Sequence, residues 1–552
     1  MLDVFVMTQS ANKLPDDVVG LKEIIAEQIL SINKFEESIN KYEAEIAHHR
    51  EEVAQVKAEN ERLEEMVRLL RHHHFGKKSE KVKSNGTQFE LGLFNEAETE
   101  NEKITEEPPS VTVKSYRRRG TPKRVALPAN LPREEIIVDL PEEEKVCSEG
   151  HELKLIGEEV SEQLDVIPAQ IKVIRTIRKK YACVICEDCV KRAPLPKTAI
   201  PKSMAGPGLL AHIATSKYGD GLPLYRQEHM WQRAGVDIPR ATMAFWMIKI
   251  GELLMPMLNL MEEELLASGY VQVDETRVQV LNELGKLAES LSYMWVRSRN
   301  GPHVKPIIIF EYDSGRSGEV AKRLFADYQG YLQADGYSGY NEVCSQEGIT
   351  RLGCMAHCRR KFFEASKASA KGVGLASEAI EMIRKLYEVE KAIKENSIED
   401  RHRIRLKESK PLLDEFRKWL DDNLGKVPPQ SQLGKALSYA HSEWPYLIRY
   451  LDDGRLSIDT NMVENAIRPF AVGRKNWLFS NSVAGAKASA AIYSIMVSAK
   501  LNGHNEYAYL RYVLEKLPYA EKVEDFEALL PHVLSPKDIP APSISQSSPP
   551  DN

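Results

Sequence analysis

Three acidic residues lie where the local sequence gives no reason for a surface charge. Asp274 interrupts the β-rich stretch SGYVQVDETRVQV, in which the alternation of valines changes parity across the acid. Asp335 ends the stretch YLQAD, and Glu464 lies in NMVENAIRPF. Carboxylates gathered at one point repel each other unless cations lie between them, and hard oxygen ligands suit Mg²⁺, or Mn²⁺ in its place. Two such ions about 4 Å apart can activate an attacking oxygen and neutralise a leaving oxygen at a phosphodiester, so these residues are candidates for metal-dependent phosphoryl transfer.

The sequence around these acids predicts the elements that must position them. Four short β-rich stretches precede helical sequence from about 357 to 450. They are YVQVDETRVQVL, LSYMWVRS, VKPIIIFEY and YLQAD. A ribonuclease-H-like sheet places the ends of its first and fourth strands side by side, so Asp274 and Asp335 would converge, and Glu464 would come from a helix packed across the sheet. We expect a bulge near Thr276, where the strand resumes after the acid.

Each acid also has a simpler interpretation. An aspartate at a strand end often caps the following turn, and Asp335, which precedes a glycine, has good turn chemistry. Glu464 lies one helical turn before Arg468, with which it could form a surface ion pair. Glu275 is a competing metal ligand next to Asp274, although neighbouring residues of a strand point to opposite faces.

Two cysteines, Cys183 and Cys186, have the CxxC spacing that lets two thiolates reach one tetrahedral Zn²⁺ ion from a tight turn. Cys147 and His151 would supply the other two ligands, at a Cys-x3-His spacing that is looser than usual. Cys189 follows at another x2 interval and is the alternative to one of them. We predict one structural zinc, and the alternative is a set of reduced thiols without a metal.

The N-terminal region keeps a heptad pattern over about 25–70. Positions a are Ile25, Ile32, Ile39, Ile46, Val53, Asn60 and Val67, and positions d are Gln28, Phe35, Tyr42, His49, Val56, Leu63 and Leu70. β-Branched residues at a, with one asparagine among them, favour a parallel two-stranded coiled coil. We therefore expect a homodimer or higher oligomer; the alternative is a single long helix packed on its own protein.

Two regions between the heptads and the acids have basic residues that could meet DNA. Residues 72–131 are charge-blocked and contain prolines, which predicts a flexible linker. Within it, Arg117, Arg118 and Arg119 precede Gly-Thr-Pro and could enter a narrow minor groove, unless they only keep the linker solvated. Further on, two helical stretches separated by a glycine have the spacing of a helix-turn-helix, with Arg240 and Thr242 at the head of its second helix. Such a pair is also common in any helical layer.

Other candidate DNA contacts lie close to the acids. The segment CMAHCRRKFF offers two cysteines and a histidine but no fourth metal ligand nearby, so we interpret it as a strand end that enters a helix. Its residues available to phosphates are Arg359, Arg360 and Lys361. Around Glu464 the candidates are Asn461, Asn465, Arg468, Arg474 and Lys475. Pro469 is expected to end or bend this helix and to leave the last two of them on a loop.

Length and composition limit the remaining possibilities. A chain of 552 residues is too long for one core. Its formal net charge of −6 means that DNA must be met by local patches. The most apolar stretch is interrupted by Lys249 and Glu252 before it reaches the roughly 18 residues that a membrane span needs. Seven cysteines without a hydrophobic leader argue against a secreted disulfide framework, so we expect a cytoplasmic, DNA-associated protein without a membrane anchor.

The chain resembles transposases of the insertion-sequence-66 family. The resemblance rests on LRHHHFGKKSEK, LPREEIIVDLPEEE, VDET, ADGYSGY, AHCRRKFFEA and NMVENAIRPFAVGRKNWLFSNS, and it covers nearly all of the chain except its two ends. It implies a leucine-zipper-like region, a zinc-binding region, a DDE catalytic domain with a helical insertion and a short C-terminal element. The triad of the family corresponds to Asp274, Asp335 and Glu464. The sequence departs from the family at Cys147, where relatives usually have a first CxxC pair.

We therefore expect a multidomain α+β protein. Its predicted parts are a parallel coiled coil at 20–71, a charged linker with a basic arm at 72–131, a zinc-binding module at 132–195, a helix-turn-helix-like region at 196–262, a ribonuclease-H-like catalytic domain at 263–500 with a helical insertion at about 360–450, a C-terminal helical element at 501–534 and a disordered tail at 535–552. The resemblance implies Mg²⁺-dependent cleavage and strand transfer at the ends of an insertion sequence, with two small accessory proteins as further partners. The alternatives are a DNA-binding regulator without catalysis and a nuclease that cuts without joining.

Overall fold

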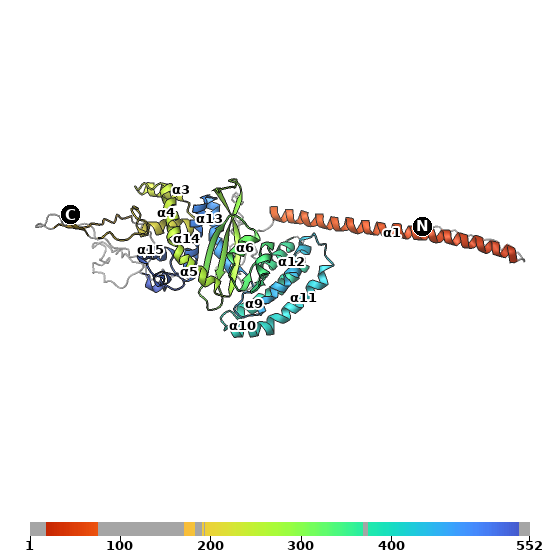
Figure 1. The fold of residues 1–552 in the computed structure, drawn as a ribbon. Coiled ribbons are helices and arrows are strands. Elements are labelled where there is room, and N and C mark those ends of the chain that lie inside the picture. The colour runs from red at the N-terminus through yellow and green to blue at the C-terminus, as the bar shows by residue number, and fades with distance from the viewer. Residues whose placement is uncertain (1–17, 76–170, 183–189, 193, 368–373, 540–552) are drawn as a thin grey trace, which may run out of the picture. The chain divides into compact units, whose positions relative to one another are not determined.

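The computed structural model describes residues 18–75, 171–182, 190–192, 194–367 and 374–539 (Figure 1). By its internal contacts the chain divides into two compact units, residues 1–101 with 196–552, and residues 102–195. The zinc-ligand candidates and the arginines of the predicted basic arm lie outside the described residues: Cys147, His151, Cys183, Cys186, Cys189, Arg117, Arg118 and Arg119. In the second unit, β1 (Lys180–Ala182) and β2 (Val190–Arg192) form a short antiparallel pair.

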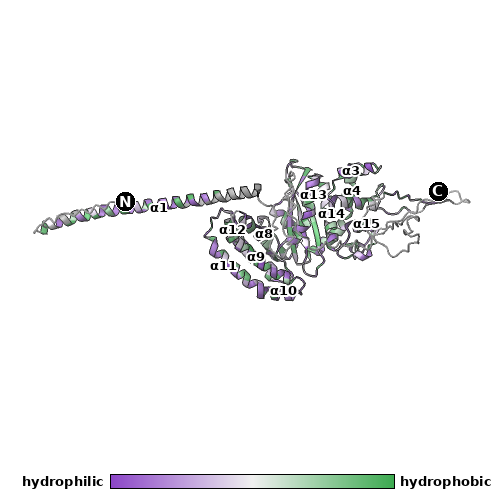
Figure 2. Ribbon diagram, turned by 180° about the vertical axis from the view of Figure 1, so that it is seen from behind, coloured by the Kyte–Doolittle hydropathy of each residue, from purple (hydrophilic) through white to green (hydrophobic). Residues whose placement is uncertain are grey.

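The heptad region forms one long helix, α1 (Val18–Phe75), of 58 residues. Figure 2 shows hydrophilic and hydrophobic residues alternating along this helix. The apolar side chains that are described at the predicted a and d positions, from Ile25 to Leu63, are exposed in the single chain, including Ile32 at 52%, Phe35 at 68% and Ile39 at 55%. The predicted helix is therefore confirmed, and these side chains have no cover from the described part of the chain.

The centre of the first unit is a six-stranded sheet with the order β5-β4-β3-β6-β7, and β8 pairs with the far end of β3. The strands are β3 (Tyr270–Asn282), β4 (Leu291–Arg299), β5 (Ile307–Asp313), β6 (Gly330–Gln333), β7 (Ile349–Leu352) and β8 (Ser480–Ser482). β3, β4 and β5 are antiparallel, whereas β6 and β7 continue the sheet in parallel with β3. The four predicted strands are confirmed as β3 to β6. β7 and β8 were not predicted, because segments of four and three residues give almost no alternation signal.

The expected bulge near Thr276 is wrong. β3 and β4 keep one unbroken antiparallel register from Gln272 to Gln279. The change of parity has another cause, because different faces of β3 are covered along its length. Val271 and Val273 are buried on one face, and Val278 and Val280 are buried on the other. Asp274 therefore lies on a regular strand at the place where the apolar face changes.

Helices cover both faces of this sheet, either directly or by packing on the helices that do (Figure 1). They are α2 (Pro207–Tyr218), α3 (Leu224–Arg233), α4 (Arg240–Leu253), α5 (Met255–Leu266), α6 (Gly318–Leu324), α7 (Asn341–Cys344), α13 (Asn461–Trp477), α14 (Val483–Leu501), α15 (Glu506–Lys516) and α16 (Val523–Glu527). The register places Asp274, Val296 and Phe310 in one row across three strands. Phe310 contacts Phe470 of α13 and Tyr493 of α14, with ring centroids 6.4 and 5.5 Å apart. α13 and α14 therefore cover the face that carries Asp274.

Helix α14 also protects the edge strand β5. The hydroxyl of Ser494 accepts a hydrogen bond from the Phe310 amide at 2.8 Å, and the hydroxyl of Ser498 accepts one from the Ile308 amide at 2.9 Å. These amides lie on the side of β5 that has no neighbouring strand. A buried edge strand needs such partners, which explains polar serines in an otherwise apolar helix.

The predicted helix-turn-helix region contains α3, a turn at Gly235 with φ of +79°, and α4. α4 buries Met243, Trp246 and Met247, and a Cβ atom at Gly251 would lie 2.8 Å from the Ala488 Cα atom of α14. α4 is thus part of the main core along most of its length. Of the two predicted DNA contacts, Arg240 is exposed and Thr242 is half-buried at the first turn of α4.

Within the described residues, no single helix has the length and apolar composition to cross a membrane. α4 and α5 pass that test only as a pair, bent by 47° between them.

A helical layer with its own core is inserted between β7 and α13. Its elements are α8 (Met355–Ser366), α9 (Leu375–Ala392), α10 (Ile398–Ile404), a π-helical turn (Arg405–Ser409), α11 (Lys410–Leu424), α12 (Gln432–Leu447) and a 3₁₀ turn (Ile448–Leu451). Phe362, Phe416, Trp419 and Trp444 pack against one another at its centre. The prediction of helical sequence from about 357 to 450 is confirmed, and so is the strand end that enters a helix at CMAHCRRKFF.

Candidate active site

The sheet register brings two of the three predicted acids together. β3 and β6 pair in parallel, with Tyr270 opposite Tyr331 and Gln272 opposite Gln333. Asp274 and Asp335 follow two residues beyond the last of these pairs, Asp274 within the longer strand β3 and Asp335 just past the end of β6. Their side chains therefore lie at the same level on one edge of the sheet.

The third acid, Glu464, lies in the first turn of α13, the helix that crosses this face of the sheet. A hollow of about 250 Å³ lies between α13, β3 and α8. It is lined by Asp274, Glu275, Thr276, His357, Arg360, Asn461, Glu464, Asn465, Ile467, Arg468 and Ala471. Asp335 does not line it, but its charge acts on Asp274. The hollow is large enough for ions with their water and for part of a substrate.

The electrostatics of the hollow favour cation binding. Burial, followed by the negative charge of Glu275 and smaller effects of Glu464 and Asp335, raises the pKa of the Asp274 carboxyl to about 8. His357 acts in the opposite direction. A carboxyl that is costly to ionise among other acids gains most from a divalent cation, so this donor set of hard oxygens fits Mg²⁺.

The raised pKa predicts how the stability of the metal-free protein depends on pH. Above the ordinary pKa of an aspartate the folded protein holds a proton that the unfolded chain has lost, so the free energy of unfolding falls as pH rises from about 4 to about 8. We expect a loss on the order of a few kcal/mol, reduced by the water that reaches the hollow. Urea unfolding at a series of pH values, without metal, measures it. The Asp274→Asn variant should show a smaller loss, and what remains comes from other carboxyls whose pKa burial raises, Glu275, Glu443 and Asp459, the last to about 6. An identical pH profile in the variant would contradict the assignment.

The simpler interpretations of the acids are partly realised. Asp335 Oδ1 accepts a hydrogen bond from the Tyr337 amide at 3.0 Å, so this residue does shape the turn after β6. The Glu275 carboxylate accepts hydrogen bonds from Arg316 and from the Tyr340 hydroxyl. These partners engage the Glu275 carboxylate, and among the described residues the Asp274 carboxylate has no such partner apart from the Glu275 amide at 2.8 Å.

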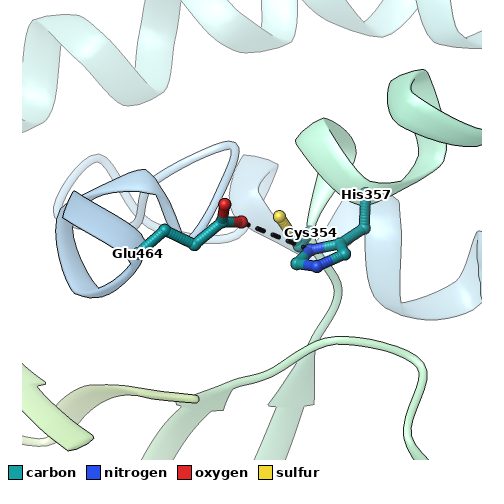
Figure 3. A group of neighbouring side chains, drawn as sticks. All are labelled: Cys354, His357 and Glu464. Carbon is teal, nitrogen blue, oxygen red and sulfur yellow. Dashed lines mark ion pairs between the residues drawn. The ribbon is translucent and has the colours of Figure 1, made fainter. Parts of the chain in front are cut away.

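The surface ion pair between Glu464 and Arg468, which is the simpler interpretation of Glu464, is not observed. Glu464 Oε2 instead accepts a hydrogen bond from Arg360 at 2.8 Å, and Oε1 lies 3.6 Å from Nδ1 of His357 (Figure 3). Arg360 and His357 both come from α8, at the start of the helical insertion. The insertion therefore contributes directly to the position of the third acid.

The predicted DNA contacts near the acids differ in their surroundings. Arg468 is exposed, lines the hollow and makes no hydrogen bond or ion pair to another described residue, so it can reach a phosphate. Asn461 and Arg474 are used internally. Asn461 donates to Asp459, and Arg474 donates to the Thr276 hydroxyl at 3.2 Å.

The other basic candidates lie on α8 and at the end of α13. Lys361 and Lys475 are exposed, whereas Arg359 and Arg360 are half-buried. Nζ of Lys361 lies 4.7 Å from the centre of the Tyr439 ring, where a cation is stabilised by the aromatic face. A phosphate would have to compete with Glu464 for Arg360 and with this ring for Lys361.

The expectation that Arg474 and Lys475 follow the helix on a loop is wrong, because α13 continues past Pro469 to Trp477. A proline inside a helix removes one amide and leaves the carbonyl four residues earlier without its partner. Here that carbonyl belongs to Asn465, an exposed residue at the edge of the hollow, where water can replace the lost bond. The last turn of α13 therefore keeps Arg474 over β3.

A buried network of glutamines fixes the segment that leads into α13. Nε2 of Gln272 donates to Gln333 Oε1 at 2.8 Å and to the Asp459 carbonyl at 2.7 Å. Nε2 of Gln333 donates to the carbonyls of Gly353 and Ser457, both at 2.9 Å. The network joins β3 and β6 to the chain just before Glu464. It therefore helps to fix the position of Glu464 relative to Asp274 and Asp335.

These glutamines were missed in the sequence, although a signal is present. Gln272 precedes Asp274 by two residues in VQVD, and Gln333 precedes Asp335 by two residues in LQAD. The same Gln-x-Asp spacing at two strand ends places both glutamines on the faces of their acids. The repeated spacing could be interpreted only once the parallel pairing of β3 and β6 was known, because that pairing puts the two glutamines side by side.

We expect Gln333→Leu to lower the free energy of unfolding by about 2 kcal/mol or more, because two buried carbonyls lose their donor. Gln279→Leu is the matched control on β3, where the side chain makes one exposed hydrogen bond and the effect should stay within about 0.5 kcal/mol. Chemical unfolding of the two variants measures the difference. Equal stability of both would show that the network does not hold the segment before α13.

The fold and the hollow define a mixed α/β protein with an acidic site at one edge of its sheet. The model of the transposase IS66 family matches residues 202–488, more than half of the chain. Three related models match other parts: the zinc-finger binding domain of transposase IS66 at 144–187, the IS66 C-terminal element at 494–532, and transposase C of IS166 homeodomain at 62–136. The chain belongs to the IS66 family of transposases. Membership indicates a nucleic-acid-processing enzyme, and the zinc-finger match indicates a structural zinc.

Proteins of Sinorhizobium fredii are similar over most of the chain. Uncharacterized protein y4qI is 33% identical over 542 residues, which are 95% of this chain and 98% of that protein. Uncharacterized protein y4jD is 34% identical over 417 residues, 73% of this chain and 81% of that protein. No solved structure matches the chain.

Proposed function

We propose that the protein is a DNA transposase that cleaves the ends of an insertion sequence and joins them to target DNA. Asp274, Asp335 and Glu464 would hold two Mg²⁺ ions, which when bound supply activation of an attacking oxygen and charge neutralisation at the phosphodiester. The observation that carries the proposal is a hollow lined by Asp274 and Glu464, with Asp335 on the neighbouring strand, in which the pKa of Asp274 is raised to about 8. Family membership supports the same activity.

The sheet supports a ribonuclease-H-like core for this reaction. Three antiparallel strands are followed by two parallel ones, and the first strand lies at the centre beside the fourth. In this order the ends of the first and fourth strands share one edge, and α13 crosses the same face. The protein then contributes mainly by positioning DNA and by placing charge. Arg468 and Asn465 at the rim of the hollow would hold the backbone near the acids.

The remaining parts of the chain would bind and pair the DNA ends. Cys147, Cys183 and Cys186 with His151, or with Cys189 in its place, would hold the structural zinc. The arginines at 117–119, with Arg240 and Thr242, would contact DNA outside the active site. α1 would pair two protomers and so bring two ends together.

The pairing through α1 is testable by charge substitution at its exposed apolar positions. We expect the double variant Ile32→Lys, Ile39→Lys to shift the full-length protein from dimer to monomer, because two buried layers lose several kcal/mol of apolar burial. Glu37→Lys, on the outer side of the same heptads, is the control that should stay dimeric. Analytical ultracentrifugation distinguishes the species. If the double variant is still a dimer, the dimer interface lies outside these positions of α1.

An assay with DNA that carries an element end and a separate target tests the whole proposal. Mg²⁺-dependent nicking at the end followed by joining to the target is the expected result. Nicking without joining would indicate a nuclease, and binding without Mg²⁺-dependent nicking would indicate a DNA-binding regulator. Each assay should be run with and without the two small accessory proteins that the resemblance to the family implies as partners.

A further inference from the structure

We propose that Cys354, His357 and Glu464 form a second metal site, for a thiophilic divalent ion such as Zn²⁺, and that its occupancy withholds Glu464 from Mg²⁺. The site itself stands on the geometry of these three residues. Its inhibitory effect rests on the proposed function. The ion would bind at the point where the helical insertion meets the acidic hollow.

The three residues lie close enough for small side-chain movements to bring their ligand atoms around one ion. One ligand atom from each, the Cys354 sulfur, a ring nitrogen of His357 and a carboxylate oxygen of Glu464, all lie within 4.8 Å of one another. Figure 3 shows the three side chains converging from α8 and α13. Ligand atoms around a tetrahedral Zn²⁺ ion are about 3.3 to 3.6 Å apart, given bonds of about 2.0 to 2.3 Å. Nδ1 of His357 already lies 3.6 Å from Oε1 of Glu464.

Two of the ligand atoms are buried and make no hydrogen bond. Nδ1 of His357 and Oε1 of Glu464 belong to the few buried polar side-chain atoms of the described residues that have no such partner. Their separation exceeds that of a hydrogen bond. A buried polar atom without a partner is costly, and an ion between these two would satisfy both.

The sulfur of Cys354 is held in a fixed position at the N-terminus of α8. Burial raises the pKa of its thiol to about 12, so an ion that binds there would have to displace the proton. The sulfur accepts hydrogen bonds from the amide of Thr460 at 3.3 Å and from its hydroxyl at 3.1 Å. These bonds orient the sulfur as surrounding residues orient the ligands of known metal sites.

The ligand set selects an ion different from the one that the acids would hold. Sulfur and imidazole ligands suit Zn²⁺ and related transition metals, whereas Mg²⁺ prefers oxygen. Three protein ligands leave a fourth position for water, which the adjoining hollow can supply. With Oε1 on the ion and Oε2 accepting a hydrogen bond from Arg360, both oxygens of Glu464 would already have a partner, which would weaken their binding of Mg²⁺. Zn²⁺ should therefore inhibit Mg²⁺-dependent cleavage.

Counting zinc in the full-length protein tests the site without any assay of activity. We expect wild type, equilibrated with Zn²⁺ and freed of loose metal, to hold one ion more per chain than either Cys354→Ser or His357→Gln. The zinc-finger region contributes equally to all of them. Cys344→Ser and Cys358→Ser are matched cysteine controls, because neither residue belongs to the group of three, and they should keep the wild-type count. Equal counts in wild type, Cys354→Ser and His357→Gln would overturn the site.

Cobalt provides a second readout of the same site. Co²⁺ in place of Zn²⁺ should give a thiolate charge-transfer band that is weaker in Cys354→Ser than in Cys358→Ser, at equal protein concentration. Circular dichroism establishes that the variants are folded. An unchanged band in folded Cys354→Ser would exclude Cys354 as a ligand.

The inhibitory effect is tested separately. The Zn²⁺ concentration that halves Mg²⁺-dependent cleavage should rise by more than about tenfold in Cys354→Ser, because a lost ligand weakens metal binding at least that much. If wild type and Cys354→Ser are equally sensitive to Zn²⁺, the proposed inhibition is wrong. The existence of the site is then decided by the zinc count alone. A protein without any Mg²⁺-dependent cleavage would contradict the proposed function, and the metal count would still decide the site.

Discussion

Asp274→Asn is expected to lower Mg²⁺-dependent DNA cleavage by at least about a thousandfold, because a metal ligand worth several kcal/mol in the transition state is lost. The same substitution should leave the protein folded and, without metal at pH 8, more stable than wild type. The reason is that an asparagine side chain keeps the shape of the aspartate and removes a charge that burial and three neighbouring acids disfavour. A cleavage assay on end-containing DNA and a thermal melt, each with and without Mg²⁺, measure the two effects.

The combination of lost activity and gained stability separates a ligand from a structural residue. If Asp274 were only a structural residue, its substitution would lower both the activity and the stability of the protein. Asp327→Asn, at an exposed position before β6, is the control that should change neither. Mg²⁺ should raise the melting temperature of wild type more than that of Asp274→Asn, because binding to the folded state stabilises it by mass action. Full cleavage by the variant would exclude Asp274 from the site.

The residues that could be predicted from the sequence are those whose role follows from local pattern. Strand alternation predicted β3 to β6, and the expected neighbourhood of the first and fourth strands predicted that Asp274 and Asp335 lie side by side, although Asp274 lies within β3 and not at its end. The prediction of a bulge at Thr276 was wrong. In the sequence, a change in the parity of the apolar residues looks the same whether the strand bulges or a different face of it becomes buried. The prediction that the helix ends at Pro469, leaving Arg474 and Lys475 on a loop, was wrong, because α13 continues to Trp477. The local sequence does not show that Asn465, whose carbonyl loses its partner, is an exposed residue.

The residues that could not be predicted act through partners far away in the sequence. CMAHCRRKFF was interpreted without a metal because no further ligand lies nearby in the chain, whereas Glu464 reaches Cys354 and His357 from α13. The pairing of Gln272 with Gln333 likewise depends on the sheet register. Arg405 gives the clearest case, since nothing in HRIRLKESK distinguishes an arginine that the fold buries completely.

Arg405→Met is expected to lower the free energy of unfolding by about 3 kcal/mol, because it leaves a buried carboxylate without its main partner. Arg405 is fully buried in the insertion, at the start of the π-helical turn. Its guanidinium forms a bidentate pair with Glu390, at 2.8 and 2.7 Å, and donates to three carbonyls, so that all five of its N–H groups are used. Arg401 lies 3.5 Å from the same carboxylate and compensates for part of the loss, which places the estimate at the lower end for a broken buried pair.

The substitution should also reach the active site. The three carbonyls belong to Tyr450, Asp453 and Leu456, on the segment that leads to α13 and Glu464. We therefore expect folded Arg405→Met to cleave DNA less well and to recover little when Glu390→Gln is added, although that second change should restore part of the stability by removing the unpaired charge. Arg403→Met, at an exposed arginine near the end of α10, should stay within about 0.5 kcal/mol of wild type. Urea unfolding and cleavage assays on the four proteins distinguish a site that depends on the insertion from one that the sheet alone can hold.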